Sequence, residues 1–576
     1  MKIYSVRSHW LSLAMAVLFA LSRFARAQFL EVDPGMAQPP FPCIAIGDYD
    51  NDGNMDVLVA GMGKKDVPFT ILYRNTGSAF VDSGVVLPGL SRATAAWGDF
   101  DGDGDLDLAM TGLNISGLPV TRIYRNDGGT FTALTNTMTQ VFAGNIAWVD
   151  YDGDGDLDLL VTGITSASST GIAFTRLYRN DGNGVFTSVP HPFPDCYVGA
   201  AAWGDYDNDG HPDLVLCGAM TGGGLVSALW HNDGHGGFTN VAAALPAMDL
   251  GFAAWGDYNN DGHLELLYGG NSDAGFITRI YRNDNGTLTD INAGLLPVLW
   301  ASAAWGDYDN DGDLDIMTIG YDADAQVARS ILYRNDGGIF SDTGTAFHNL
   351  YLGALGWLDY DGDNRLDLIM AGNEVGTDIL RIAHNIGPAS NALPSAPSSL
   401  FVTLNGTNVD LSWNVGTDPQ TPAAGLTYNL RVGTNSGGSQ VVAAQSGSNG
   451  RRRIPAMGNM QQARTAHLHG LVPGATYYWS VQSVDTAFAG SPFAPEATFT
   501  MLPESPLNTA FTRDAAGTVH ATWRGTPGIT YRVEASSDLQ TWTTVSNLTA
   551  NGAGLFDLLE TPAPEISVRY YRARFP

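Results

Sequence analysis

The sequence predicts an all-β protein, a seven-bladed β-propeller followed by two small β-sandwich-like domains. One acidic motif, D-x-D-x-D-G-x-x-D with small variations, begins at seven places that lie 50 to 55 residues apart. A repeat of this length is typical of a propeller or a solenoid. We find no segment with a helical period over the roughly ten residues that a helix needs. The seven first aspartates are Asp48, Asp99, Asp150, Asp205, Asp257, Asp307 and Asp359.

The third repeat indicates what one structural unit contains. An apolar run rich in leucine and valine follows the acidic loop, and a Tyr-Arg-Asn-Asp-Gly segment then predicts a strand that ends in a tight turn. Four antiparallel strands make one propeller blade, so seven repeats predict seven blades. The expected strands are residues 145–149, 157–162, 174–179 and 186–189.

The seventh repeat lacks a fourth strand of its own. After residues 379–385 the chain continues into Gly387 and Pro388, whereas residues 29–32 resemble the fourth strands at 186–189 and 238–241. We therefore expect the N-terminal segment to complete the seventh blade. Closing the ring in this way would remove two exposed sheet edges.

The acidic loops have the spacing of a calcium ligand set. Calcium takes roughly six to eight oxygen ligands, and a tight turn can bring alternate carboxylates to one point. Positions 1, 3 and 5 would supply side chains, the glycine at position 6 permits the bend, position 7 offers a backbone carbonyl, and position 9 adds a last carboxylate. An EF-hand is excluded because its last ligand falls at about position 12, inside a helix. The sequence therefore predicts up to seven calcium ions.

The predicted ligands are the residues at positions 1, 3, 5, 7 and 9 of each loop. They are Asp48, Asp50, Asp52, Asn54 and Asp56; Asp99, Asp101, Asp103, Asp105 and Asp107; Asp150, Asp152, Asp154, Asp156 and Asp158; Asp205, Asp207, Asp209, His211 and Asp213; Asp257, Asn259, Asp261, His263 and Glu265; Asp307, Asp309, Asp311, Asp313 and Asp315; and Asp359, Asp361, Asp363, Arg365 and Asp367.

Two loops depart from the pattern. Asn259 replaces an aspartate in the fifth loop, which removes one negative charge and predicts weaker binding. In the seventh loop Asn364 replaces the position 6 glycine, and asparagine tolerates a left-handed backbone better than most residues. His211 and His263 stand at position 7, where only the carbonyl is needed, so their side chains are not expected to bind metal. Because four carboxylates in one turn repel one another, we expect the ions to be structural.

The charge balance argues against a nucleic-acid partner. The formal net charge is -30 at pH 7, and seven divalent ions would offset fourteen of these charges. The basic run Arg451-Arg452-Arg453 is expected to be an exposed loop of a small domain. No motif for catalysis is found, and no catalytic residue is predicted.

The N-terminus has the layout of a secretory signal peptide. Lys2 and Arg7 are followed by an apolar run at residues 10–21 and by Ala-Arg-Ala at 25–27. Cleavage before Gln28 predicts a secreted or cell-surface protein, with a transmembrane helix as the alternative. We find no later apolar stretch long enough to span a bilayer.

Three cysteines do not form a disulfide framework. Cys217 occupies a strand position that threonine holds in other repeats, which predicts a small buried residue. A bridge between Cys196 and Cys217 is the alternative.

The repeat resembles a known family. The Ala-Trp-Gly-Asp and Leu-Asp-Leu flanks and the Tyr-Arg-Asn-Asp-Gly-x-x-Phe segment resemble the FG-GAP/VCBS repeat, which is similar to the integrin alpha-chain propeller. That resemblance implies the fold and calcium binding, and says little about function. Residues 409–413, 426–432 and 471–481 look like strands of a fibronectin type III domain. The expected limits are 1–27 for the signal peptide, 28–388 for the propeller, 394–502 for the type III domain and 505–576 for a small β domain.

Function is expected on the face of the ring opposite the calcium loops, where the connections vary in length. The recurring tryptophans, at 97, 148, 203, 255, 305 and 357, are expected to pack between blades, and the histidines are scattered without a visible acid-base pair. The leading hypothesis is a monomeric, non-catalytic adhesion protein that binds an extracellular glycan or protein. A calcium-dependent polysaccharide lyase or hydrolase and a purely structural matrix protein are the alternatives.

Overall fold

The computed structural model describes residues 29–135, 138–406, 408–563, 566 and 568–575. The predicted signal peptide at 1–27 lies outside the described residues. The regular structure within them is β, apart from one short 3-10 turn at Lys64–Asp66. Across the same residues there is no helix of the length and apolarity needed to cross a membrane.

Seven four-stranded antiparallel sheets form the blades, as predicted. Blades 1 to 4 are β2 (Cys43–Gly47), β3 (Asp56–Met62), β4 (Pro68–Asn75) and β5 (Phe80–Asp82); β6 (Ser91–Gly98), β7 (Asp107–Leu113), β8 (Pro119–Asp127) and β9 (Thr130–Ala133); β10 (Ile146–Val149), β11 (Asp158–Ile164), β12 (Ala173–Asn180) and β13 (Phe186–Val189); and β14 (Ala201–Gly204), β15 (Asp213–Ala219), β16 (Leu225–Asn232) and β17 (Phe238–Asn240).

The remaining blades continue the same order around the ring. Blades 5 to 7 are β18 (Met248–Gly256), β19 (Glu265–Ser272), β20 (Gly275–Asp284) and β21 (Thr287–Asp290); β22 (Leu299–Gly306), β23 (Asp315–Asp322), β24 (Val327–Asn335) and β25 (Phe340–Asp342); and β26 (Tyr351–Leu358), β27 (Asp367–Glu374), β28 (Thr377–Asn385) and β1 (Phe29–Val32). The second strand of each blade is almost wholly buried, which explains its continuous apolar sequence.

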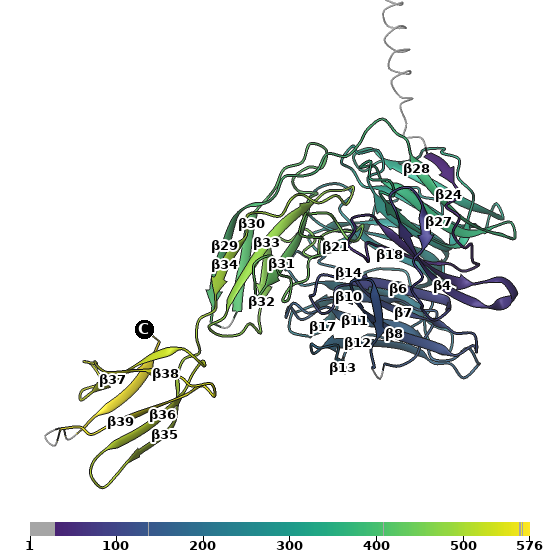
Figure 1. Cartoon of the computed structure of the whole chain (residues 1–576). Coiled ribbons are helices and arrows are strands. Elements are labelled where there is room, and N and C mark those ends of the chain that lie inside the picture. Colours follow the sequence, from purple (N-terminus) through teal and green to yellow (C-terminus); the bar gives the residue numbers. More distant parts are fainter. Residues whose placement is uncertain (1–28, 136–137, 407, 564–565, 567, 576) are drawn as a thin grey trace, which may run out of the picture. The chain divides into compact units, whose positions relative to one another are not determined.

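The N-terminal strand closes the ring, as predicted. β1 pairs antiparallel with β28, with Phe29 opposite Asn385 and Val32 opposite Ile382, and Figure 1 shows this strand in purple beside β28. The inner strands contact one another in the cyclic order β2, β6, β10, β14, β18, β22, β26 and again β2. The blade that joins the two ends of the propeller is therefore built from both of them.

The recurring tryptophans pack between blades. Trp148 Nε1 donates to the carbonyl of Ala96 in the preceding blade at 3.2 Å, and Trp305 Nε1 does the same to Ala254 at 3.2 Å. A Cβ added to Gly98 would lie 2.6 Å from Trp148 Cδ1. The glycine of Ala-Ala-Trp-Gly thus makes room for the tryptophan of the next blade, and the predicted packing role is confirmed.

The cysteines are buried thiols. Cys43, Cys196 and Cys217 are all free, so the alternative bridge between Cys196 and Cys217 is wrong. Cys217 lies in β15 and is 1% exposed, as expected for a small core residue.

The residues after the propeller form four three-stranded sheets. Their strands are β29 (Ser398–Asn405), β30 (Asn408–Asn414) and β32 (Thr465–Leu468); β31 (Thr427–Gly433), β33 (Thr476–Val484) and β34 (Ala497–Thr500); β35 (Leu507–Arg513), β36 (Val519–Arg524) and β39 (Leu555–Glu560); and β38 (Thr543–Thr549), β37 (Thr530–Ser536) and β40 (Tyr570–Arg574).

These residues divide between two compact units. Ser412–Ala466 and Trp479–Glu496 belong to the same unit as the propeller, and we call these two stretches the cap segments. The second unit comprises Phe401–Leu411, His467–Tyr478 and Ala497–Pro576. Its core includes Tyr531 and Phe556, whose rings stack with their centroids 4.9 Å apart.

Candidate metal centre

Each acidic loop joins the first and second strands of a blade and brings its carboxylates together. In the first loop Asp48, Asp50 and Asp56 each place an oxygen within 4.8 Å of the others. Positions 1, 3 and 9 of the second and third loops do the same. The spacing of the motif therefore produces clusters that could hold a metal ion.

The loop backbone explains two further positions of the motif. Position 6 is left-handed throughout, with φ of 89° at Gly53 and 61° at Asn364, so the substituted seventh loop keeps the same turn. Position 4 is left-handed as well, with φ of 58° at Asn51 and 68° at Gly102. Only glycine or asparagine occupies position 4, a regularity that was not used in the sequence analysis.

Asparagine at position 4 also joins neighbouring loops. Asn51 Nδ2 donates to Asp105 Oδ1 at 2.6 Å, and Asn260 Nδ2 donates to Asp313 Oδ1 at 2.9 Å. In the fourth loop Asn208 Nδ2 lies 2.9 Å from His263 Nδ1. In these three loops the side chain at position 7 thus contacts the preceding loop, and only its backbone carbonyl is assigned to a metal.

The last carboxylate of each loop is fixed from two sides. Asp107 Oδ2 accepts from the backbone N–H of Phe100 at 2.9 Å, and its Oδ1 accepts from that of Asn126 at 2.8 Å. The position 9 side chain is 0% exposed in every loop, so water does not reach it and its hydrogen-bond partners all come from the protein. The same pair of contacts recurs around the ring, including at Glu265 in the fifth loop.

The asparagine of the Tyr-Arg-Asn segment links each loop to the blade before it. Asn126 Nδ2 donates to the carbonyl of Tyr49 at 2.8 Å, and Asn385 Nδ2 donates to that of Tyr308 at 2.7 Å. Asn75 Nδ2 completes the circle through the carbonyl of Tyr360 at 2.8 Å. We call these seven contacts the interblade clamps; the others are made by Asn180, Asn232, Asn283 and Asn335.

The electrostatics of the loops favour a bound cation. Burial, together with neighbouring carboxylates, raises the pKa of Asp56 to about 8 and that of Asp107 to about 9. At position 3, the Oδ1 atoms of Asp101, Asp207 and Asp309 are buried and make no hydrogen bond. Buried carboxylate oxygens without donors are the groups that a hard cation would satisfy, so the residues present fit calcium.

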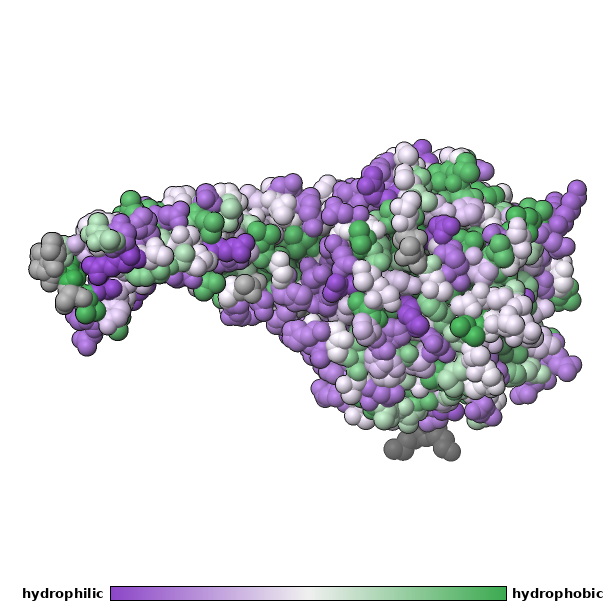
Figure 2. Space-filling model, turned by 90° about the horizontal axis from the view of Figure 1, so that it is seen from below, coloured by the Kyte–Doolittle hydropathy of each residue, from purple (hydrophilic) through white to green (hydrophobic). Residues whose placement is uncertain are grey.

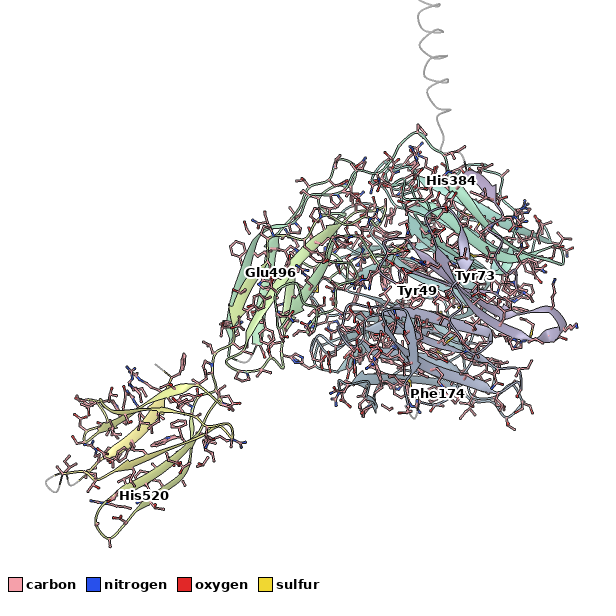
Figure 3. All side chains as sticks on the ribbon, viewed as in Figure 1. Tyr49, Tyr73, Phe174, His384, Glu496 and His520 are labelled. Carbon is pink, nitrogen blue, oxygen red and sulfur yellow. The ribbon has the colours of Figure 1, made fainter. Side chains whose placement is uncertain are left out.

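The residue before the interblade asparagine reaches the acidic loop in four blades, whereas in blades 2, 3 and 5 the arginine at this position pairs with the aspartate of the following turn. Arg74 Nε lies 2.6 Å from Asp50 Oδ2, and Arg334 Nε lies 3.1 Å from Asp309 Oδ2. In the fourth blade this residue is His231, and in the seventh it is His384, labelled in Figure 3. Both histidines join carboxylate clusters, a placement that the sequence, in which the histidines are scattered without a visible acid-base pair, did not indicate.

The cap segments cover the metal loops. The carbonyl of Arg453 accepts from the N–H of Asp48 at 2.8 Å, and Gln461 Oε1 accepts from the N–H of Asp205 at 2.7 Å. Thr486 Oγ1 donates to Asp307 Oδ2 at 2.8 Å. Three of the predicted first-position ligands are therefore held by residues more than a hundred positions away in the sequence.

Other loops approach the cap segments through their backbone. A Cβ at Gly155 would lie 2.0 Å from the carbonyl oxygen of Val441, and one at Gly102 would lie 2.8 Å from that of Ser439. In the fifth loop Gln462 Nε2 donates to Asp257 Oδ2 at 2.5 Å. The metal-loop face of the propeller is thus an internal interface of the chain.

The basic run takes part in this interface. Arg451 Nη1 donates to the carbonyl of Gly53 at 3.1 Å, and Arg453 Nη1 lies 4.0 Å from Asp99 Oδ2. Arg452 and Arg453 are 5% and 8% exposed, so the prediction of an exposed loop is wrong for both. Arg452 is buried because its guanidinium donates to the carbonyls of Ala456 and Met457.

Comparison with known proteins supports the repeat. Five segments match the FG-GAP-like repeat, at residues 48–110, 116–161, 164–216, 205–268 and 257–318. The human T-cell immunomodulatory protein is 29% identical over 180 residues, which are 30% of this chain and 28% of that protein. This chain therefore spans little more than a quarter of that relative.

Solved structures with low similarity cover much of the chain. A rhamnogalacturonan lyase from Bacillus licheniformis aligns with a TM-score of 0.33 and 15% identity, covering 62% of this chain and 74% of that one. A mutant Aleuria aurantia lectin in complex with alpha-methyl-L-fucoside aligns with a TM-score of 0.30 and 11% identity, covering 56% and 96%. Five segments of this chain thus match the FG-GAP-like repeat, and its four-stranded sheets form a β-propeller.

Proposed function

We propose that this chain is a secreted or cell-surface, calcium-stabilised propeller that binds an extracellular glycan or protein without catalysis. The acidic loops would hold calcium through the carboxylates at positions 1, 3, 5 and 9 and the carbonyl at position 7. Calcium would neutralise carboxylates whose raised pKa values reflect burial beside one another. Its role on this proposal is structural.

The proposed ligand site is inferred from the position of the cap segments, which lie against the metal-loop face of the propeller. Because the cap segments lie on that face, a macromolecular ligand would bind at the opposite ends of the inner strands. Seven residues at those ends have a left-handed backbone, an arrangement that is costly for residues other than glycine. They are Phe41, Arg92, Ala143, Val198, Leu250, Trp300 and Leu352, with φ between 47° and 52°.

Aromatic side chains gather at this end of the ring. The ring centroid of Trp300 lies 6.0 Å from those of Tyr321 and Tyr351, and all three side chains are half-buried. Arg92 lies over the ring of Phe41 at 5.9 Å. Rings with a polar edge suit a ligand that is apolar on one face and hydroxylated on its edges, such as a sugar. Figure 2, which views the molecule from another side, shows hydrophobic and hydrophilic groups intermixed over the surface that it draws.

A glycan-binding screen with and without calcium tests the proposal. We expect binding that is lost in Trp300→Ala and retained in the control Trp542→Ala, whose tryptophan lies in the second unit. Circular dichroism would establish that both variants are folded. Binding that Trp300→Ala leaves unchanged would contradict the proposed site, and new unsaturated sugar ends would favour a polysaccharide lyase instead.

A further inference from the structure

The fourth and seventh loops differ from the others in one residue of the adjoining third strand. Five blades carry an arginine there, whose charge is permanent, whereas the fourth and seventh carry His231 and His384. A neutral imidazole offers a nitrogen ligand to a metal, which a guanidinium cannot do. The five arginines are Arg74, Arg125, Arg179, Arg282 and Arg334.

His231 lies within the carboxylate cluster of the fourth loop. Its Nδ1 is 3.1 Å from Asp207 Oδ2 and 3.4 Å from Asp213 Oδ1, and its Nε2 is 3.9 Å from Asp209 Oδ2. Asp207 Oδ1 is a buried atom without a hydrogen-bond partner, and the buried His231 Nδ1 has Asp207 Oδ2 beside it. The imidazole and three carboxylates thus converge, and one carboxylate oxygen among them is left without a donor.

His384 is placed in the same way in the seventh loop. Its Nδ1 is 3.2 Å from Asp367 Oδ1 and 3.7 Å from Asp361 Oδ2. The ring of Tyr360 meets the imidazole edge to face, with centroids 5.3 Å apart, and so restricts its orientation. His384 is therefore a positioned group of the loop.

The ligand types separate these loops from the other five. Imidazole nitrogen suits zinc, copper, nickel and cobalt, whereas calcium takes oxygen. In the first loop the position is filled by a cation, since Arg74 Nη2 lies 2.8 Å from Asp52 Oδ2. A loop with arginine can offer a metal only oxygens, and a loop with histidine can offer a mixed set.

The geometry points to two mixed nitrogen–oxygen sites, in the fourth and seventh loops, that take a divalent transition ion of the zinc or cobalt class in preference to calcium. This inference rests on the proposed metal-binding role of the loops. It divides the seven loops into five oxygen-only sites and two that include a histidine nitrogen.

Equilibrium dialysis of the full chain against Co²⁺ in excess calcium, followed by elemental analysis and visible absorption, tests the inference. We expect about two cobalt ions per chain, with an absorption band that reports nitrogen ligation. His231→Gln and His384→Gln should each remove one ion and weaken its site at least tenfold. His520→Gln is the matched control, because that histidine lies in the second unit and its replacement should leave both ions in place.

A gain-of-site variant keeps the test independent of folding defects. Arg74→His gives the first loop the residue of the fourth and should raise the cobalt count from two to three. The inference would be overturned if the wild-type chain bound no cobalt or bound it equally at all seven loops. It would also be overturned if the histidine variants left cobalt binding unchanged. Five calcium ions without cobalt would overturn it while supporting the proposed function, whereas cobalt without calcium would do the reverse.

Discussion

Replacing Thr486 by valine should loosen the cap segments from the propeller. The hydroxyl donates to Asp307 Oδ2 at 2.8 Å, and the two side chains are nearly inaccessible, with Thr486 5% and Asp307 1% exposed. Valine keeps the shape and removes the donor, so one oxygen of a buried carboxylate loses a partner. A hydrogen bond to a charged group contributes about 1.5–3 kcal/mol.

Hydrogen exchange of the calcium-loaded chain measures this effect locally, which is preferable because a multi-unit protein does not unfold in one step. The expected loss corresponds to a decrease of about 13- to 160-fold in the protection of residues 485–490. Thr465→Val, at an exposed position of β32, is the control and should leave that protection unchanged. A change of less than about twofold in Thr486→Val, or equal changes in both variants, would refute the reasoning.

Four further predictions concern the ring. Excess EDTA should lower its melting temperature, and a melting temperature that EDTA leaves unchanged in calorimetry would contradict a structural metal. The metal-free chain should lose stability as the pH rises from about 4 to 9. Folding raises the pKa of Asp56 to about 8 and of Asp107 to about 9, so the folded chain holds protons that it must release across that range. Deleting residues 28–35 should lower the melting temperature sharply, since β28 would lose its partner; unchanged melting would show that closure contributes little. Asn126→Ala should cost about 1–3 kcal/mol in urea unfolding, because it leaves the buried carbonyl of Tyr49 unpaired, and Thr132→Ala, at an exposed position of β9 in the same blade, is the comparison.

The repeat could be predicted because its signals are local and recur. The acidic loop, the buried second strand and the N-terminal completion of the last blade all follow from residues whose neighbours in space are one repeat away. The same periodicity shows that the asparagine at position 126 recurs in every blade. It does not show that the side chain bonds a carbonyl of the preceding blade, because an amide can donate to any carbonyl near it.

The cap segments could not be predicted in this way. Their contacts to Asp48, Asp205 and Asp307 use a carbonyl, an amide and a hydroxyl from positions with no repeat, so nothing in the spacing pairs them with the loops. Charge was misleading for Arg452, because its burial depends on backbone carbonyls that only the folded chain brings together. The histidines at 231 and 384 were detectable, since each replaces arginine in an otherwise regular segment.

The interblade clamps give the propeller a property that a linear repeat protein does not have. In an open array the terminal repeats have one neighbour each, and loss of structure can begin there. Here Asn75 bonds to the seventh blade in the same way that Asn126 bonds to the first, so every blade has two neighbours. The ring therefore has no terminal blade at which unfolding can begin. Since each clamp runs between the loop regions of adjacent blades, loss of an ion from one of the proposed sites should first affect the two proposed sites beside it.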